Sequence, residues 1–298
     1  MSAGTSYRES TARERIARFF DAGSLEEWLP PSARLSSPHL PALGLPVAFD
    51  DGVVVGAATL LGHRVLFAAQ EPAFMGGAVG EVHGAKLTGL LRRALTDRPD
   101  GVVLMFDTGG VRLHEANAGL IAISEIQRAL FDARRAGVPV VLVAAGANGC
   151  YGGLSIVGRS ADAIVMTEEG RLSVSGPEVI ESQHGVEEFD ARDRALVWRT
   201  MGGKHRWLIG EADALVDDAF GPLREATVRA LATPVPIDLA TVRAAHRALE
   251  RRLRRFGAMD DAVEIWRELG LEDPEGVPMA EVAALVARAD TIREHGRG

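Results

Sequence analysis

The sequence predicts an α/β fold in which parallel strands alternate with helices. Two short apolar runs rich in β-branched residues, at 102–106 and 138–145, have the length of strands. A helical pattern at 116–135 separates them, as in two parallel strands joined by a crossover helix. A Gly-Gly pair follows each run, at 109–110 and 152–153. Because the loops after parallel strands gather at one edge of the sheet, we expect both glycine turns to face one crevice.

Composition limits the function classes. The chain has 298 residues, of which 47% are hydrophobic and 5% aromatic, and it contains 33 glycines, a balance typical of tight α/β packing. A formal net charge of −8 argues against a nucleic-acid binder, which usually carries a basic stripe. The single cysteine, Cys150, excludes an intrachain disulfide and a cysteine-based zinc ribbon.

Targeting signals are not apparent in the sequence. The first 20 residues are polar and charged and lack the apolar core of a signal peptide. No segment reaches the ~18 uninterrupted apolar residues of a membrane span. We therefore expect a cytoplasmic protein with neither a membrane nor a nucleic acid as partner.

The chain divides into three expected parts. Residues 1–46 are predicted to form an N-terminal helix, at 8–20, and an extended surface wrap. Residues 47–222 form the central domain, which opens with a hairpin at 52–70 and a helix at 79–95. Residues 223–298 read as a helical C-terminal extension.

The second half of the central domain continues the alternation. We expect a short helix at 154–157, a strand at 163–167 and another short strand at 172–174. Pro177 is placed to begin the next helix. Residues 185–220 are expected to be helical on either side of the glycine-containing segment 201–206.

Most familiar catalytic motifs are absent. There is no G-x-S-x-G elbow, no Walker A sequence and no G-x-G-x-x-G after a strand. Ser155 has no assignable histidine partner, and neither His83 nor His114-Glu115 shows a repeated metal-ligand spacing. No metal site is expected.

What remains is chemistry by backbone amides. A Gly-Gly turn allows two N–H groups to point at one oxygen without a Cβ in the way. Two such turns at one crevice predict an oxyanion hole for a thioester carbonyl that becomes an enolate. The candidate catalytic residues are Gly109, Gly110 and Val111 in the first turn and Gly152 and Gly153 in the second.

Several motifs together resemble the crotonase-like carboxyltransferase superfamily. The segment DTGGVR at 107–112 matches that superfamily's D-S-G-G-A-R, and CYGG at 150–153 matches its T-x-G-G turn. The segments at 11–16, 21–24 and 173–181 also resemble conserved stretches of these proteins. The resemblance covers residues 8–290 and implies a crotonase/ClpP-like spiral of ββα units.

Within the superfamily, the stretch at 185–206 is similar to malonate decarboxylase β subunits. That resemblance implies decarboxylation of a malonyl thioester, held on an acyl-carrier subunit, to an acetyl thioester and CO2. The implied partners are a γ subunit, the acyl-carrier subunit and a malonyl-loading α subunit. The carrier would hold a phosphoribosyl-dephospho-CoA prosthetic group, this chain would bind no cofactor, and biotin is not expected to be required.

The chain departs from the superfamily in three ways. Val111 replaces the usual alanine of the first motif. The zinc ribbon of bacterial acetyl-CoA carboxylase β subunits and the second homologous domain of fused carboxyltransferases are both missing. We therefore expect a partner subunit to complete the active site.

Side chains near the turns are candidates for two further roles. Tyr151, His114, Glu115 or water would return a proton to the enolate, with Tyr151 preferred, although an aromatic side chain more often serves packing. Four basic residues are candidate contacts for the carrier arm: Arg112, Lys86, Lys204 and Arg206. The basic residues at 204–206 have an equal interpretation as a solvated turn.

Two other functions stay open. The same glycine turns could serve a carboxyltransferase β subunit of a biotin-dependent acyl-CoA carboxylase. The chain could also be a non-catalytic scaffold that docks the carrier or the γ subunit. Release of CO2 without biotin favours decarboxylation over both.

Overall fold

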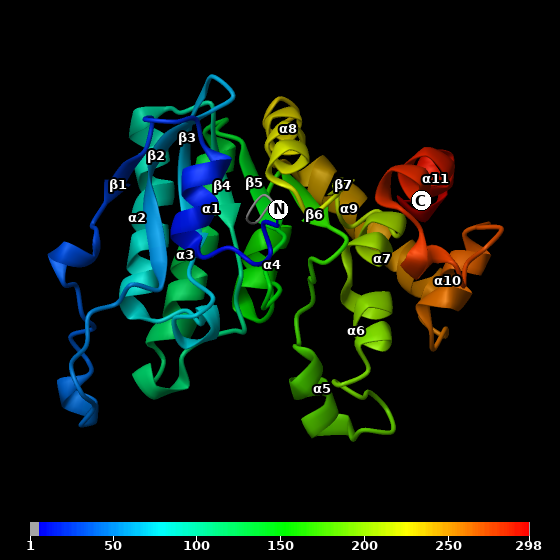
Figure 1. Ribbon diagram of the computed structural model, residues 1–298, viewed down its shortest axis with the longest axis horizontal. Helices are drawn as coiled ribbons and strands as arrows, with labels where there is room; N and C mark the ends of the chain where they lie inside the picture. The colour runs from blue at the N-terminus through cyan, green and yellow to red at the C-terminus, as the bar shows by residue number, and fades with distance from the viewer. Residues whose placement is uncertain (1–5, 298) are drawn as a thin grey trace, which may run out of the picture.

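The structure, a computed structural model, describes residues 6–297. Within them, seven strands form one sheet and lie in chain order (Figure 1). β1 pairs with β2 and β2 with β3 in antiparallel orientation, whereas the pairs from β3 to β7 are all parallel. The strands are β1 (Glu26–Trp28), β2 (Val53–Leu60), β3 (His63–Gln70), β4 (Gly101–Met105), β5 (Val140–Ala144), β6 (Ala163–Thr167) and β7 (Ala214–Val216).

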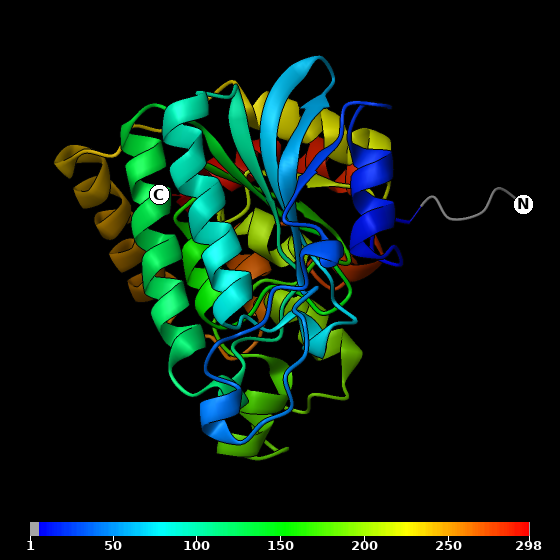
Figure 2. The ribbon, with the colours of Figure 1, turned by 90° about the vertical axis from the view of Figure 1, so that its left-hand side faces the viewer.

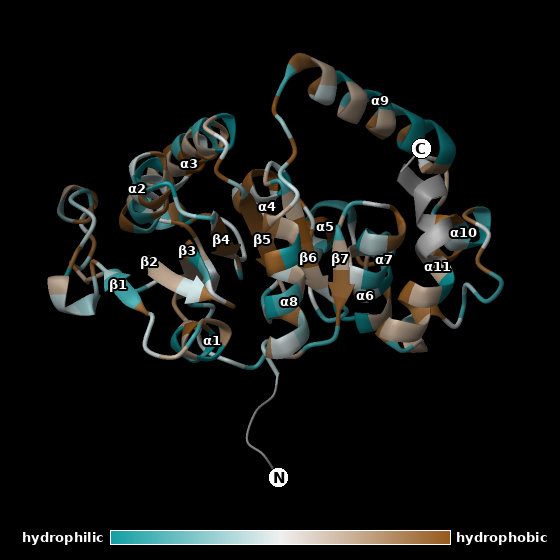
Figure 3. Cartoon of the chain, turned by 90° about the horizontal axis from the view of Figure 1, so that it is seen from above, coloured by the Kyte–Doolittle hydropathy of each residue, from teal (hydrophilic) through white to brown (hydrophobic). Residues whose placement is uncertain are grey.

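Helices cover both faces of the sheet. α2, α3 and α4 lie on one face and α1 and α8 on the other (Figure 3), and α2 and α3 run side by side (Figure 2). The helices are α1 (Ala12–Phe19), α2 (Glu81–Asp97), α3 (Ala118–Arg135), α4 (Gly153–Arg159), α5 (Pro177–His184), α6 (Arg194–Met201), α7 (Gly203–Leu208), α8 (Phe220–Leu231), α9 (Leu239–Phe256), α10 (Ala262–Glu268) and α11 (Val282–Arg297).

Alternation along the buried strands builds two separate cores. In β4, Val102 and Leu104 pack beneath α2 and α3, whereas Val103 and Met105 face α1 and α8. Successive side chains of a strand point to opposite faces, so a strand covered on both sides is apolar throughout. The predicted α/β fold and its central unit of β4, α3 and β5 are therefore confirmed.

The predicted hairpin is also confirmed. β2 and β3 pair along their full length, and two residues join them. Leu61 has φ 48° and Gly62 has φ 86°. Positive φ at both central positions gives the turn a twist that matches the flanking strands.

Four local predictions are wrong. The predicted wrap contains β1, and the predicted helical region 185–220 contains β7, because short edge strands form by pairing rather than by a local pattern. Residues 172–174 form no strand, and Leu172 makes only an isolated bridge to Cys150. The glycine-containing segment at 201–206 is largely helical, because α7 begins at Gly203.

The first and the last helices lie in different parts of the molecule (Figure 3). α1 packs against β2 and β3, and its N-cap Thr11 forms a capping box with Glu14. α10 and α11 lie beyond α7 and β7, and α9 stands apart from the sheet (Figure 3). None of the helices described between residues 6 and 297 is both long and apolar enough to cross a membrane.

Candidate active site

The first glycine turn follows β4 directly. The Thr108 N–H donates to the Gly149 carbonyl at 2.7 Å, which ties this turn to the second one. The Gly109 N–H donates to the Gly76 carbonyl at 2.9 Å, and the Gly110 N–H donates to the Thr108 hydroxyl oxygen at 3.1 Å. Both of these predicted amide donors therefore already have a partner within the chain.

The second turn follows β5 and touches the first. Gly152 has φ 64° and ψ −148°, a backbone conformation that is essentially restricted to glycine. A Cβ added at Gly152 would lie 3.0 Å from the Gly110 Cα, so the two turns are in contact. The Tyr151 N–H donates to the Thr108 carbonyl at 3.1 Å, and the Gly152 N–H donates to the Val174 carbonyl at 2.9 Å.

Two amides flank this contact without an acceptor. Among residues 6–297, no protein group accepts a hydrogen bond from the N–H of Val111 or of Gly153. Gly153 is the first residue of α4, and the first N–H groups of a helix have no partner within it. Helix dipoles also make this end favourable for negative charge. Among the predicted donors, one amide of each turn, that of Val111 and that of Gly153, therefore lacks an acceptor in the described part of the chain.

Tyr151 lies beside the second turn but is buried. Its ring packs with Phe189, Val197 and Met201, and only 4% of the residue is exposed. Burial raises the pKa of Tyr151 to about 12. Its hydroxyl has no hydrogen-bond partner among the described residues. Its role as proton donor stays a prediction, and a phenol with this pKa would be a weak acid at neutral pH.

Arg112 and Lys86, two of the predicted arm-binding cations, are engaged inside the chain. Arg112 is buried and forms ion pairs with Asp50 and with Glu115, the latter at 3.1 Å. Lys86 donates to the Val53 carbonyl at 3.2 Å, and burial lowers the pKa of its ammonium group. Contact with a phosphate at either side chain would require exchange of these partners.

Lys204 and Arg206, the other two cations, sit in α7. Lys204 is buried, and its Nζ lies 2.8 Å from a Glu168 carboxylate oxygen and 2.9 Å from the Pro278 carbonyl. Arg206 pairs with Glu211 at 2.7 Å. The interpretation of these residues as a solvated turn is therefore wrong. Their contact with a carrier arm stays a prediction.

His114 and Glu115, the other candidate proton donors, follow the first turn. The His114 side chain is partly exposed and lies 3.7 Å from the Glu115 carboxylate. That carboxylate is buried, and it is compensated there by its ion pair with Arg112 and by the Glu81 N–H, which it accepts at 2.7 Å. No group of three metal-ligating side chains occurs in the described part of the chain.

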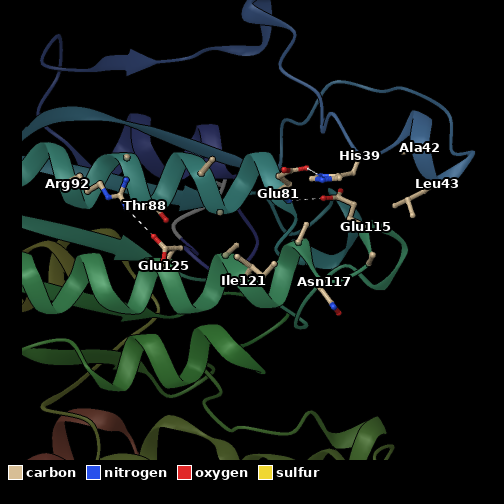
Figure 4. A pocket seen from close by; sticks show the side chains of 16 residues that line it. His39, Ala42, Leu43, Glu81, Thr88, Arg92, Glu115, Asn117, Ile121 and Glu125 are labelled. Atoms are coloured by element: carbon tan, nitrogen blue, oxygen red, sulfur yellow. Dashed lines mark hydrogen bonds and ion pairs between the residues drawn. The ribbon is translucent and has the colours of Figure 1, made fainter.

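A cavity of about 590 Å³ lies between α2 and α3 (Figure 4). Its floor contains small residues such as Gly84 and Ala122. The ion pair of His39 with Glu81 lies toward one end, and Arg92 pairs with Glu125 toward the other (Figure 4). The glycine turns themselves do not line this cavity.

Sequence reasoning missed a buried ion pair beneath the turns. Arg15 of α1 lies 2.8 Å from the Asp107 carboxylate, and both side chains are excluded from solvent. Arg15 shares the buried face of α1 with Ala12, Ile16 and Phe19. An arginine on the apolar face of a helix is the signal that could have revealed it.

The chain is similar to known carboxyl transferase proteins. Residues 6–202 match the model of the carboxyl transferase domain. The chain is 35% identical over 320 residues to malonyl-S-ACP:biotin-protein carboxyltransferase MADC from Malonomonas rubra, covering 97% of this chain and 96% of that protein.

Solved structures show the same relationship. The chain is 41% identical to a chain of a Pseudomonas malonate decarboxylase hetero-tetramer in complex with malonate, with a TM-score of 0.78 and coverage of 89% and 97%. It is 37% identical to a chain of the Pseudomonas MdcD–MdcE hetero-dimer, with a TM-score of 0.66 and coverage of 85% and 97%. The predicted crotonase fold is confirmed by these neighbours. The chain therefore belongs to the carboxyl transferase family, among the relatives of the malonate decarboxylase subunits.

Proposed function

We propose that the chain is the β subunit of a malonate decarboxylase. It would convert a malonyl thioester on an acyl-carrier subunit to an acetyl thioester and CO2. The observation that carries the proposal is the pair of acceptor-free amides, at Val111 and Gly153, on either side of the touching glycines. The two Pseudomonas malonate decarboxylase structures support the choice of substrate.

The chemistry follows from where charge develops. The bond between the malonyl methylene carbon and its carboxylate breaks, and its electron pair moves into an enolate on the thioester oxygen as CO2 leaves. Amide donors aimed at that oxygen stabilise the transition state more than the substrate. A proton then adds to the methylene carbon to give the acetyl group.

The proposal includes partner subunits. The similar Pseudomonas chains are parts of a hetero-tetramer and a hetero-dimer, and Gly109 is exposed at the first turn. We assign the second wall of the active site to a γ subunit and substrate delivery to the acyl-carrier subunit, with an α subunit loading malonyl. The phosphoribosyl-dephospho-CoA arm belongs to the carrier, and this chain supplies backbone donors rather than a cofactor.

Carboxyl transfer to biotin is a second candidate. The relative from Malonomonas rubra, which matches the chain over almost its full length, is a malonyl-S-ACP:biotin-protein carboxyltransferase. The same enolate would form, but the carboxyl group would pass to a biotin nitrogen instead of leaving as CO2. Both reactions use the two amides in the same way.

One experiment separates these functions. The chain is purified with its homologous γ subunit and supplied with malonyl-loaded carrier, and CO2 and acetyl-carrier are measured with and without a biotinylated protein. The proposal expects equal amounts of both products in the absence of biotin. Turnover only with the biotinylated protein supports carboxyl transfer, and no turnover in either case contradicts an active role for the turns.

A further inference from the structure

A buried arginine reaches the candidate site from the far N-terminal helix. Arg15 lies in α1, and its guanidinium is 2.8 Å from Asp107, which immediately precedes the first glycine turn. The same guanidinium donates to the carbonyls of Tyr7 and Arg8, each at 3.1 Å. The guanidinium carbon also lies over the ring of Tyr7, 4.6 Å from the ring centroid. Arg15 is thus held on several sides with its charge directed at one carboxylate.

The Asp107 carboxylate connects the two turns. It accepts the N–H of Ala147 at 3.1 Å and the N–H of Asn148 at 2.7 Å, both from the loop that leads to the second turn. A Cβ added at Gly146 would lie 2.1 Å from the Asp107 carboxyl carbon, so this loop leaves no space around the carboxylate. A shift of Asp107 would therefore move both turns.

The backbone of Asp107 secures a third loop. Its N–H donates to the Gln70 side-chain oxygen at 2.8 Å, and the Gln70 amide nitrogen donates to the Gly77 carbonyl at 3.0 Å. The neighbouring Gly76 carbonyl accepts the Gly109 N–H at 2.9 Å. Three loops at one edge of the sheet thus share a single buried polar network.

We infer that Arg15 is a positioning residue for the active site. By fixing the Asp107 carboxylate against the loop of Ala147 and Asn148, it sets the separation of the amide donors at Val111 and Gly153. Donor placement matters because a small displacement from the reacting atoms greatly lowers a rate. This role rests on the proposed function, since the two amides face a thioester oxygen only under that function.

The geometry requires arginine rather than a positive charge alone. Three guanidinium nitrogens serve three acceptors, at Tyr7, Arg8 and Asp107. A lysine has one ammonium nitrogen on a flexible stem and cannot reproduce this planar arrangement. The informative variant is therefore Arg15→Lys, which keeps the charge and removes the fork.

The chain supplies a matched control at the opposite edge of the sheet. Arg134 pairs with Asp162 at 3.1 Å and donates to the carbonyls of Ser160 and Val235. Asp162 accepts two backbone N–H groups, just as Asp107 does. The variant Arg134→Lys thus disturbs a similarly bonded, half-buried pair without touching the glycine turns.

The test compares the two variants by kinetics and by amide hydrogen exchange. In the assembled complex, Arg15→Lys is expected to lower kcat about 10- to 100-fold with little change in KM, whereas Arg134→Lys keeps kcat near the wild-type value. In the purified chain, Arg15→Lys is expected to speed exchange in peptides covering 107–112 and 146–153 selectively.

Two results would overturn the positioning role. One is that these peptides exchange equally fast in Arg15→Lys and Arg134→Lys. The other is that the two variants have the same kcat although the peptides exchange faster in Arg15→Lys. If the wild-type complex shows no turnover of malonyl thioester, the proposed function fails instead. The exchange comparison still decides whether Arg15 orders the turns. Should Arg15→Lys not fold, Gly146→Ala displaces Asp107 from the opposite side and is expected to give the same pattern.

Discussion

Two buried histidines dominate the expected response of this protein to mild acid. The Gln70 amide nitrogen donates to His83 Nε2 at 3.1 Å, within the network beneath the turns, and His205 packs near Trp266. Burial lowers the pKa of each imidazole to about 3. Between about pH 3 and 6.5 the unfolded chain therefore binds more protons than the folded chain, and stability falls as pH falls.

The expected slope is measurable. Each histidine contributes up to about 1.4 kcal/mol of unfolding free energy per pH unit within that window. Urea unfolding at about pH 7 and about pH 5 should show this loss in the wild type, and the double variant His83→Gln/His205→Gln should show a much smaller one. A wild-type slope no steeper than that of the double variant would show that these imidazoles are not kept neutral by the fold.

Individual site residues differ in how far the sequence could predict them. The glycine turns were visible because a Gly-Gly pair follows each of two apolar runs. Which of these amides already donate to an acceptor within the chain could not be predicted, because the acceptors of Gly109 and Gly152 lie in other loops, at Gly76 and Val174. The pairing of Arg15 with Asp107 joins positions that no local pattern connects.

At the scale of elements, α1 does more than cover the sheet, since it carries Arg15. Its start is fixed by Thr11, whose side chain accepts the Glu14 N–H while the Glu14 carboxylate accepts the Thr11 N–H at 2.8 Å. Loss of such a cap costs about 1 kcal/mol. The position of the arginine therefore depends on a well-formed first turn of this helix.

The cap gives a direct prediction. Thr11→Ala should lower the unfolding free energy by about 1 kcal/mol, because it leaves an N–H of the first turn without an acceptor. Thr11→Ser keeps the hydroxyl and should remain close to the wild type. Chemical denaturation of both variants measures the difference, and equal stabilities for alanine and serine would contradict the contribution of the cap.

Elements were predictable where packing and local pattern agree. The buried strands and α2 and α3 have apolar faces that specify them, whereas β1 and β7 have three residues each and depend on pairing. The glycines at 202 and 203 suggested a flexible turn. A Cβ at Gly203 would lie 2.0 Å from the Thr167 carbonyl, so this glycine allows a helix to pack closely against β6.

At the scale of the whole molecule, the sheet delivers three loops to one edge, and the core of each face holds them there. α2 and α3 close one side and α1 the other, so the acceptor-free amides lie above two separate hydrophobic cores. The similar solved chains work within hetero-oligomers. We therefore assign the backbone donors to this chain and expect a partner to supply the rest of the active site.

The amide of Gly153 allows the most direct test of this claim. A Cβ there would lie 2.6 Å from Ile123 Cγ1, so Ile123→Ala makes room for a side chain. Proline is accepted at the first residue of a helix, where α4 begins, and it removes the N–H that alanine keeps.

The measurement compares Gly153→Pro/Ile123→Ala with Gly153→Ala/Ile123→Ala in the assembled complex, following CO2 release from malonyl-carrier. Loss of one oxyanion donor should lower kcat of the proline variant about 100- to 1,000-fold relative to the alanine variant. Equal kcat in two correctly folded variants would contradict the assignment of this amide to the oxyanion hole.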